Sequence, residues 1–259
     1  MGWSWLPALV CAAFGVLSGL AVPALIARIP EPEPEPAPEP RLESVPGGSG
    51  AEVDATVPAE ASPPEPPKQL YADIARLPHL PVKTSIAAGL VALLLGGVMG
   101  WDAALLPVFY LVPVGVALAV VDWRTRLLPT RLIAPSYLVV AVLVLVAFAI
   151  DRDPHALLTA ALGWLVAGGT FFVLWFVYPK GMGYGDVRLA GVLGLALGYQ
   201  GWAVLLTGVY AGFLVGGVGG LLLSLLRLVD RKAYPFGPFI LAGAVVGVVL
   251  GPAVGAWYG

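Results

Sequence analysis

Seven long runs of uncharged, mostly apolar residues dominate this chain of 259 residues. They cover residues 4–27, 84–101, 103–121, 132–150, 156–179, 189–226 and 233–259. Each run is close to or above the roughly 20 residues that an α-helix needs to cross a bilayer. Charged residues make up only 12% of the chain, and its mean hydropathy is +0.88, far from the composition of soluble domains. The runs therefore predict a membrane protein built from helices.

The sixth run, residues 189–226, is too long for one membrane crossing. Its 38 residues would form a helix about 57 Å long, whereas the hydrocarbon core of a bilayer is about 30 Å thick. We expect the run to fold back near residues 199–201. The predicted fold class is therefore an all-α, polytopic membrane helical bundle with about eight transmembrane helices.

The part of the chain before the second run divides into two segments. Residues 1–28 contain an apolar run that is longer than the core of a cleaved signal peptide, and no basic segment precedes it, so we expect a retained N-terminal transmembrane anchor. Residues 29–81 include PEPEPEPAPEP, which predicts a disordered Pro/Glu-rich linker. Near its end, QLYADIARL predicts a short amphipathic helix on the membrane surface. Residues 82–259 form the main transmembrane domain.

The distribution of Lys and Arg predicts how the bundle is oriented. With eight spans, residues 28–83, 122–131, 180–188 and 227–232 share one face of the membrane. That face carries 13 of the 14 basic residues, and Arg152 is the exception. Basic loops favour the cytoplasmic side, so this face is predicted to be cytoplasmic.

Two aspartates stand out when the 16 acidic residues are sorted by position. Nine of the acidic residues lie in the Pro/Glu-rich linker. Five others fall in loops or surface segments, namely Asp73, Asp102, Asp151, Asp153 and Asp230. Asp122 and Asp186 remain, each at the cytoplasmic mouth of an apolar run. An ordinary interfacial role also fits this position, with each carboxylate paired to a nearby base such as Arg124 or Arg188.

The stretch GMGYGDVRL, residues 181–189, places three glycines directly before Asp186. A glycine costs about 1 kcal/mol relative to alanine inside a helix, so Gly181, Gly183 and Gly185 predict a loop. Glycine also lets another backbone approach closely, so this loop can receive an extended peptide. Asp186 is then expected near a helix N-terminus, where a carboxylate is favoured.

The residues that most often hold metals are sparse. Cys11 is the one cysteine, so a disulfide or a Cys-based metal site is not expected. His79 and His155 are far apart in the sequence. We predict no metal and no cofactor, and no nucleic-acid partner.

Three segments resemble one protein family. GMGYGDVRLAGVLGLALG is similar to the G-x-G-D motif of the prepilin peptidases, the type IV leader peptidase family of intramembrane aspartyl proteases. VDWRTRLLPTRL resembles the family's other aspartate, which ends a span and is followed by a basic loop and Leu-Pro. YPFGPFILAG resembles the stretch that opens the family's last helix.

The resemblance implies an enzyme and its site. The chain would be an aspartic-type endopeptidase of the plasma (inner) membrane. It would cut the leader of a type IV pilin or pseudopilin precursor on the cytoplasmic face, at the start of the precursor's hydrophobic helix. The implied catalytic residues are Asp122 and Asp186. The implied supporting residues are Gly181, Gly183, Gly185, Arg188 and Pro129. The resemblance leaves open whether the chain forms a homo-oligomer.

This chain departs from the family pattern in three places. Many bacterial members carry two C-x-x-C pairs between their first two spans, whereas this chain has the Pro/Glu linker there. An accessory N-methyltransferase activity is therefore not expected. Arg188 replaces the usual lysine after the motif, and Thr130 replaces the acid that often follows Leu-Pro. Neither change removes a catalytic carboxylate.

Peptide hydrolysis by two carboxyls needs one ionised group to take a proton from water and one protonated group to donate a proton. Two carboxyls that share a site hold one proton between them, because two adjacent negative charges repel. The sequence does not assign these roles between Asp122 and Asp186. Two other classes stay open: a small proton- or cation-coupled membrane transporter, and a non-catalytic scaffold for pilus assembly.

Overall fold

The computed structural model describes residues 3–31, 69–179, 181–226 and 235–258. Within these ranges, seven helices are long and apolar enough to cross a membrane. They are α1 (Trp5–Ala27), α3 (Leu80–Met99), α4 (Leu105–Thr125), α5 (Thr130–Asp151), α6 (Pro154–Val177), α8 (Trp202–Leu225) and α9 (Gly237–Tyr258). Two shorter helices are α2 (Tyr71–Ala75) and α7 (Tyr184–Gly198). The predicted all-α membrane bundle is confirmed, and the chain is an integral membrane protein.

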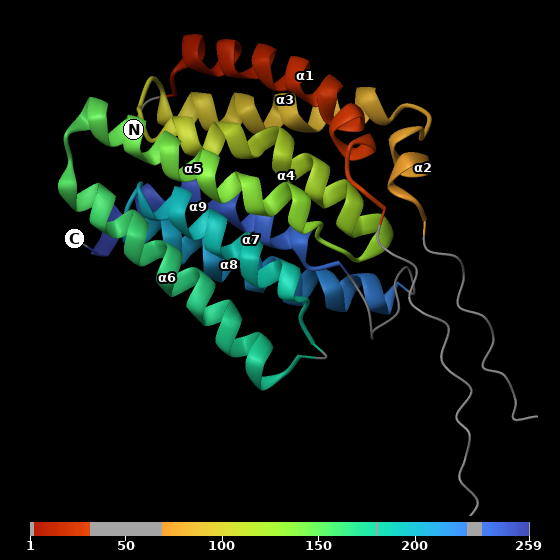
Figure 1. Ribbon diagram of the computed structural model, residues 1–259. Helices are drawn as coiled ribbons and strands as arrows, with labels where there is room; N and C mark the ends of the chain where they lie inside the picture. The colour runs from red at the N-terminus through yellow and green to blue at the C-terminus, as the bar shows by residue number, and fades with distance from the viewer. Residues whose placement is uncertain (1–2, 32–68, 180, 227–234, 259) are drawn as a thin grey trace, which may run out of the picture.

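The long helices run side by side, with both chain ends at one end of the bundle and α2 at the other (Figure 1). The helix α7 lies at the centre, because 11 of its 15 residues are buried and it contacts α4, α5, α6, α8 and α9. The outer helices present large apolar side chains outward. Leu138 of α5 is 70% exposed and Phe176 of α6 is 71% exposed. Such a surface is suited to lipid and would be unusual on a soluble monomer.

The long sixth run folds back where the sequence predicted. The helix α7 ends at Gly198 and α8 begins at Trp202. Between them Gly201 has a φ of 108°, a backbone conformation that glycine adopts without steric cost. With 15 residues, α7 is about 22 Å long, less than the hydrocarbon thickness of about 30 Å. The helix α7 is therefore shorter than a full transmembrane span.

Three helix pairs pack most closely in the described bundle: α1 with α3, α6 with α7, and α8 with α9. Small residues line each seam. A Cβ atom on Gly194 of α7 would overlap the backbone oxygen of Gly163 in α6, and a Cβ atom on Gly243 of α9 would overlap the backbone of Gly212 in α8. Small residues let helix backbones approach closely, which is how helices associate in lipid.

The seam between α8 and α9 gives a stability prediction. We expect Gly243→Ala to destabilise the bundle by about 1–3 kcal/mol, because the new methyl group has no space. Gly217→Ala in α8 is the matched control, since a Cβ atom there meets nothing within 4 Å. Thermal unfolding in detergent should show a lower melting temperature for Gly243→Ala only. Equal melting temperatures for both variants would contradict the close seam.

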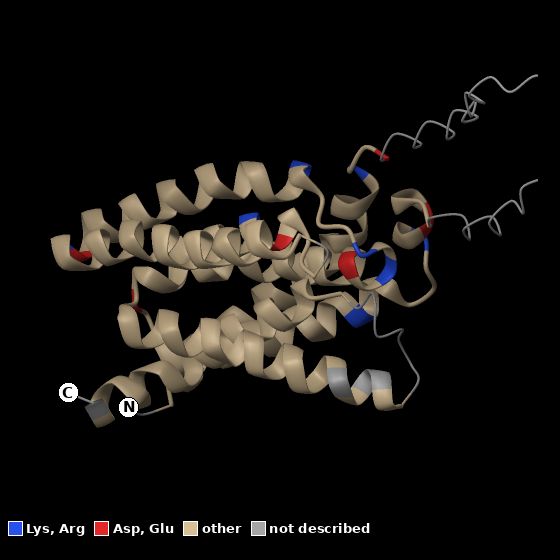
Figure 2. Cartoon of the chain, turned by 90° about the horizontal axis from the view of Figure 1, so that it is seen from below, with Lys and Arg blue, Asp and Glu red and all other residues tan. Residues whose placement is uncertain are grey.

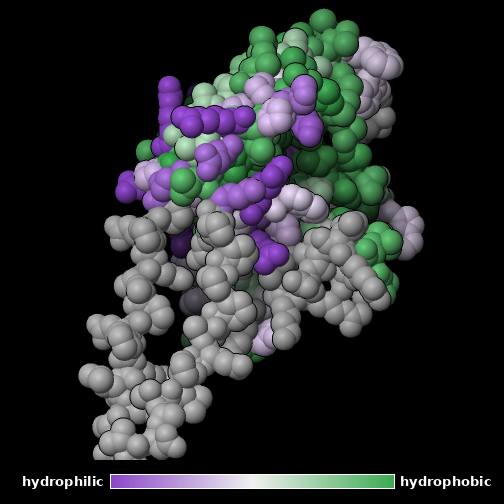
Figure 3. All heavy atoms as spheres, turned by 90° about the vertical axis from the view of Figure 1, so that its right-hand side faces the viewer, coloured by the Kyte–Doolittle hydropathy of each residue, from purple (hydrophilic) through white to green (hydrophobic). Residues whose placement is uncertain are grey.

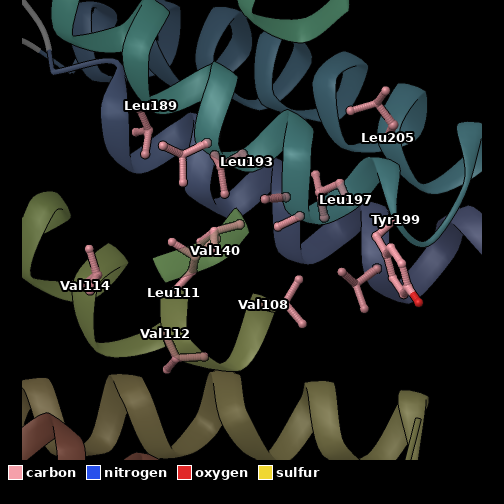
Figure 4. Close-up of a cluster of buried hydrophobic side chains, with 14 of the residues drawn as sticks. Val108, Leu111, Val112, Val114, Val140, Leu189, Leu193, Leu197, Tyr199 and Leu205 are labelled. Carbon is pink, nitrogen blue, oxygen red and sulfur yellow. The ribbon is translucent and has the colours of Figure 1, made fainter. Parts of the chain in front are cut away.

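A large apolar cluster fills the centre of the bundle. Figure 4 shows Leu193 and Leu197 of α7 lying across from Val108 and Leu111 of α4, while Val112 lies next to α3. These side chains belong to one cluster of buried apolar residues that α1 and the helices from α3 to α9 contribute. The cluster fixes α4 against α7, the two helices that carry Asp122 and Asp186.

The short helix α2 packs against protein. Tyr71 is 4% exposed and Ile74 is 1% exposed, and both join a cluster with residues of α1 and α4, including Ile26 and Val121. The predicted short helix is confirmed, but Tyr71 and Ile74 face the ends of α1 and α4 instead of the membrane surface.

The contacts of Glu31 show that the predicted disordered linker begins later than residue 29. Its carboxylate accepts hydrogen bonds from the backbone N–H groups of Tyr71 and Ala72, each at 2.9 Å. Glu31 thereby caps the first turn of α2, a position that favours a carboxylate. The two flanks of the linker meet at this point. The linker between them, residues 32–68, lies outside the described residues.

One end of the bundle is polar. Figure 2 shows most of the described Lys and Arg residues on the half of the bundle away from the chain ends. Figure 3 views this end and shows hydrophilic residues gathered on it, with hydrophobic residues along the flanks. The bases predicted for this face at Arg41, Lys68, Lys180, Arg227, Arg231 and Lys232, and the acid Asp230, lie outside the described residues.

Candidate active site

Asp122 lies in the last turn of α4. The helix ends at Thr125, and Arg126 follows in the left-handed conformation, with its N–H donating to the backbone oxygen of Asp122 at 2.8 Å. The Asp122 side chain is 4% exposed. Its Oδ2 accepts a hydrogen bond of 2.9 Å from the backbone N–H of Gly237, at the start of α9. The carboxylate is therefore held between the end of one helix and the start of another.

Asp186 lies in the first turn of α7. Gly183 is the N-cap residue, and its backbone N–H donates to Asp186 Oδ2 at 3.1 Å. A carboxylate in the first turn interacts favourably with the helix dipole. Asp186 is 7% exposed, and within the described residues its Oδ1 atom is buried without a hydrogen-bond partner. One oxygen is thus fixed, while the other remains available to a proton, a water molecule or a substrate.

The Leu128 side chain packs beside both aspartates, against Gly185 and Gly237. A Cβ atom on Gly185 would lie 2.6 Å from Leu128 Cβ, and a Cβ atom on Gly237 would lie 3.2 Å from Leu128 Cδ2 and 2.8 Å from Asp122 Oδ2. The Leu128 side chain therefore touches both the residue before Asp186 and the residue that holds Asp122. The two carboxyl groups are close enough to interact electrostatically.

The pairing of these carboxylates with nearby bases does not occur among the described residues. Neither Asp122 nor Asp186 forms an ion pair with a described Arg or Lys. The guanidinium group of Arg188 instead donates to the Thr130 hydroxyl and lies 4.6 Å from the centre of the Tyr184 ring. Burying a carboxylate without a neighbouring base is costly, so ion pairing with the described bases does not explain the position of either aspartate.

The remaining predicted residues lie near the starts of α5 and α7. Pro129 is the N-cap residue of α5 and follows Leu128 directly. Gly185 is half-buried against Leu128, while Gly181 and Gly183 are exposed. Gly181 and Gly183 belong to the predicted loop, whereas the prediction of a loop was wrong for Gly185, which lies in the first turn of α7 because the helix begins at Tyr184.

Three contact residues were missed by the sequence analysis. Gly237 donates to Asp122 from 115 positions further along the chain, and Leu128 packs against both Gly185 and Gly237. A signal for Gly237 existed in the segment YPFGPFILAG, which was noted only for its resemblance. Tyr137 was also missed, and its hydroxyl donates to the backbone oxygen of Arg188 at 2.8 Å. Among the described residues, no group of three or more His, Cys, Asp or Glu side chains is placed to hold a metal ion.

Comparison with known proteins gives the family. The profile of the type IV leader peptidase family matches residues 109–251, more than half of the chain. The chain belongs to this family. The matched region of this leader peptidase family member contains Asp122, Asp186 and Gly237. The resemblance inferred from the sequence motifs is confirmed.

Similar curated proteins are named prepilin leader peptidase/N-methyltransferase. The protein of Aeromonas salmonicida is 31% identical over 186 residues, which cover 71% of this chain and 61% of that protein. The protein of Pseudomonas aeruginosa is 28% identical over 185 residues, which also cover 71% of this chain and 61% of that protein. The protein of Bacillus subtilis is 28% identical over 160 residues, which cover 61% of each chain. The match thus spans about three fifths of the length of these relatives. No solved structure matches the chain.

Proposed function

We propose that this chain is an aspartic endopeptidase that removes the leader peptide of type IV prepilin-like precursors. The observation that carries the proposal is a pair of buried carboxyl groups at the ends of α4 and α7 that interact electrostatically, with one oxygen of each anchored by a backbone N–H. Membership of the type IV leader peptidase family supports the same reaction.

The reaction needs no group beyond the two carboxyls and water. The ionised carboxylate takes a proton from water as the water oxygen bonds to the peptide carbonyl carbon. The protonated carboxyl donates its proton to the carbonyl oxygen. The ionised carboxylate then takes back a proton from one hydroxyl of the tetrahedral diol, while the other carboxyl gives its proton to the leaving nitrogen as the C–N bond breaks, so the pair again holds one proton. The backbone contacts of Gly237 and Gly183 orient the carboxylates in this cycle.

The precursor's leader is proposed to lie extended over the glycine loop before α7. Gly181 and Gly183 are exposed there, and exposed backbone groups can hydrogen-bond to a peptide strand. The cleaved bond would then lie between the loop and the two carboxyl groups. The described bases near this end of the bundle support a cytoplasmic orientation in the inner membrane.

A transporter is less consistent with this geometry. A carboxylate on an ion path is expected near the middle of the membrane, whereas Asp122 lies three residues before the end of α4 and Asp186 lies in the first turn of α7. Family membership also favours a peptidase.

Cleavage of a precursor by the purified chain tests the proposal. We expect one new product when a type IV prepilin is incubated with the chain in lipid nanodiscs, detected as a mobility shift. N-terminal sequencing should place the cut directly before the hydrophobic helix. The new N-terminus should carry no methyl group even when S-adenosylmethionine is supplied. An intact precursor in the presence of folded chain would contradict the proposed function.

A further inference from the structure

An apolar groove lies between α3, α4, α7 and α9 and holds a volume of about 250 Å³. Each of the four helices contributes side chains, for example Val91 of α3, Val116 of α4, Leu193 of α7 and Val245 of α9. Every lining residue is Val, Leu, Ala or Gly. A groove of this kind offers no hydrogen bonds to water and favours an apolar occupant.

The groove begins within one to two helical turns of the candidate active site. Residues three or four apart lie on the same face of a helix. On α4, the lining ends at Ala119, and Asp122 follows three residues later. On α7, Leu193 lies two helical turns after Asp186, and on α9 the lining begins one turn after Gly237. All three helices therefore lead from the carboxyl groups into the groove, along the direction that crosses the membrane.

The groove is open to the side of the bundle. Ala242 of α9 is exposed, and Val91, Val116 and Val245 are partly exposed. These residues lie in the membrane-crossing parts of their helices. An occupant can therefore enter from the lipid without passing through the polar end of the protein.

We propose that this groove binds the hydrophobic helix of the precursor, directly after the bond that is cleaved. The inference rests on the proposed function. In such a precursor, the residues after the cut are apolar and begin a helix, so they must leave the carboxyl groups in the direction of the bilayer. The groove is the apolar surface that starts there. A helix alongside α4 from Asp122 to Val108 would place about its first 14 residues against the groove, since both helices rise by about 1.5 Å per residue.

Disulfide cross-linking tests this assignment. The background is Cys11→Ala, which removes the chain's one cysteine, combined with Asp186→Asn so that the precursor is held uncut. The probe is a designed precursor with a short basic leader ending in glycine, followed by an apolar helix of about 20 residues. Its single cysteine is moved through the first half of that helix. A cysteine in place of Val245, which lines the groove, detects a precursor helix that lies there. Leu138→Cys is the matched control, because it lies on the lipid face of α5, eight residues into its helix as Val245 is into α9.

Val245→Cys should form adducts that rise and fall with a period of three to four positions along the precursor helix, whereas Leu138→Cys should not. Equal yields at both sites, adducts between two copies of the chain, or no adducts would overturn the assignment. Failure of the proposed function gives a different result, since the wild-type chain would then leave the precursor uncut. Cleavage without position-dependent adducts overturns the groove assignment alone.

A second measurement separates the precursor from a lipid acyl chain as the occupant. Ala242→Trp partly fills the opening of the groove, and Leu138→Trp adds the same side chain on the lipid face of α5. We expect Ala242→Trp to raise the KM for the precursor about tenfold, the scale of a steric change in an apolar pocket, with little change in kcat. Leu138→Trp should leave both constants unchanged. An unchanged KM in Ala242→Trp would indicate that the groove holds lipid instead.

Discussion

Asp122→Asn and Asp186→Asn should each abolish leader cleavage while the protein stays folded. Asparagine has nearly the shape of aspartate, and its carbonyl oxygen can still accept the N–H of Gly237 or Gly183. It can neither take a proton from water nor supply one to the leaving group. We expect the rate of cleavage to fall by at least about 100-fold in each variant, the usual scale of general acid–base catalysis. Rates measured on a purified precursor in nanodiscs provide the test.

Asp73→Asn is the control for this pair. Asp73 is an exposed carboxylate in α2, close to the same end of the bundle, and its replacement removes one negative charge without touching the two buried carboxyls. Its cleavage rate should match that of the unchanged chain. If either Asp122→Asn or Asp186→Asn keeps normal cleavage, that aspartate has no part in the reaction.

The second large effect is expected for Gly237→Ala. The added methyl carbon would lie 2.8 Å from Asp122 Oδ2 and 3.2 Å from Leu128 Cδ2. The carboxylate must then move from its position and lose its hydrogen bond to the backbone. A displacement of about 1 Å at a reacting group can reduce the rate about 100-fold. We therefore expect kcat to fall by about that factor, with little change in KM.

Gly169→Ala in α6 is the matched control for this substitution, since a Cβ atom there meets nothing within 4 Å. Both variants should fold, because Leu128 and Asp122 can shift at modest cost. A second readout separates positioning from simple instability: the melting temperature of Gly237→Ala should stay within a few degrees of that of the control. Unchanged kcat in Gly237→Ala would show that the contact between Asp122 and α9 does not orient the carboxylate.

Much of the fold could be predicted from the apolar runs, because in a membrane a span must be helical and about 20 residues long. The reversal between α7 and α8 was predictable for the same reason, since a run of 38 residues cannot cross once. The interior position of α7 was not predictable. Its composition resembles that of the outer helices, and only the packing of small residues such as Gly194 against α6 places it at the centre.

The parts of the candidate site that could be predicted are those where a reactive side chain lies beside a recognisable local pattern in the sequence. Asp122 and Asp186 are acidic residues beside apolar runs, and the glycines before Asp186 predict the start of a helix. Leu128 carries no such local signal, and the signal for Gly237 was limited to its place in YPFGPFILAG, because the roles of both residues arise from contacts with residues far away in the sequence. Glu31 was assigned to the linker by its surroundings of Pro and Glu. Its role as the cap of α2 depends on a partner 40 positions away.

The central claim is that Asp122 and Asp186 face one another across a shared site. Two cysteines in their place, in the Cys11→Ala background, test it most directly with mercuric ion, which bridges two neighbouring thiols. The account predicts an internal bridge in the Asp122→Cys, Asp186→Cys double variant. It predicts none in the control pair Asp102→Cys, Asp186→Cys, because Asp102 lies in the loop before α4, at the other end of that helix. If the Asp122 and Asp186 positions each react singly with mercuric ion but never bridge, the two carboxyl groups do not share a site.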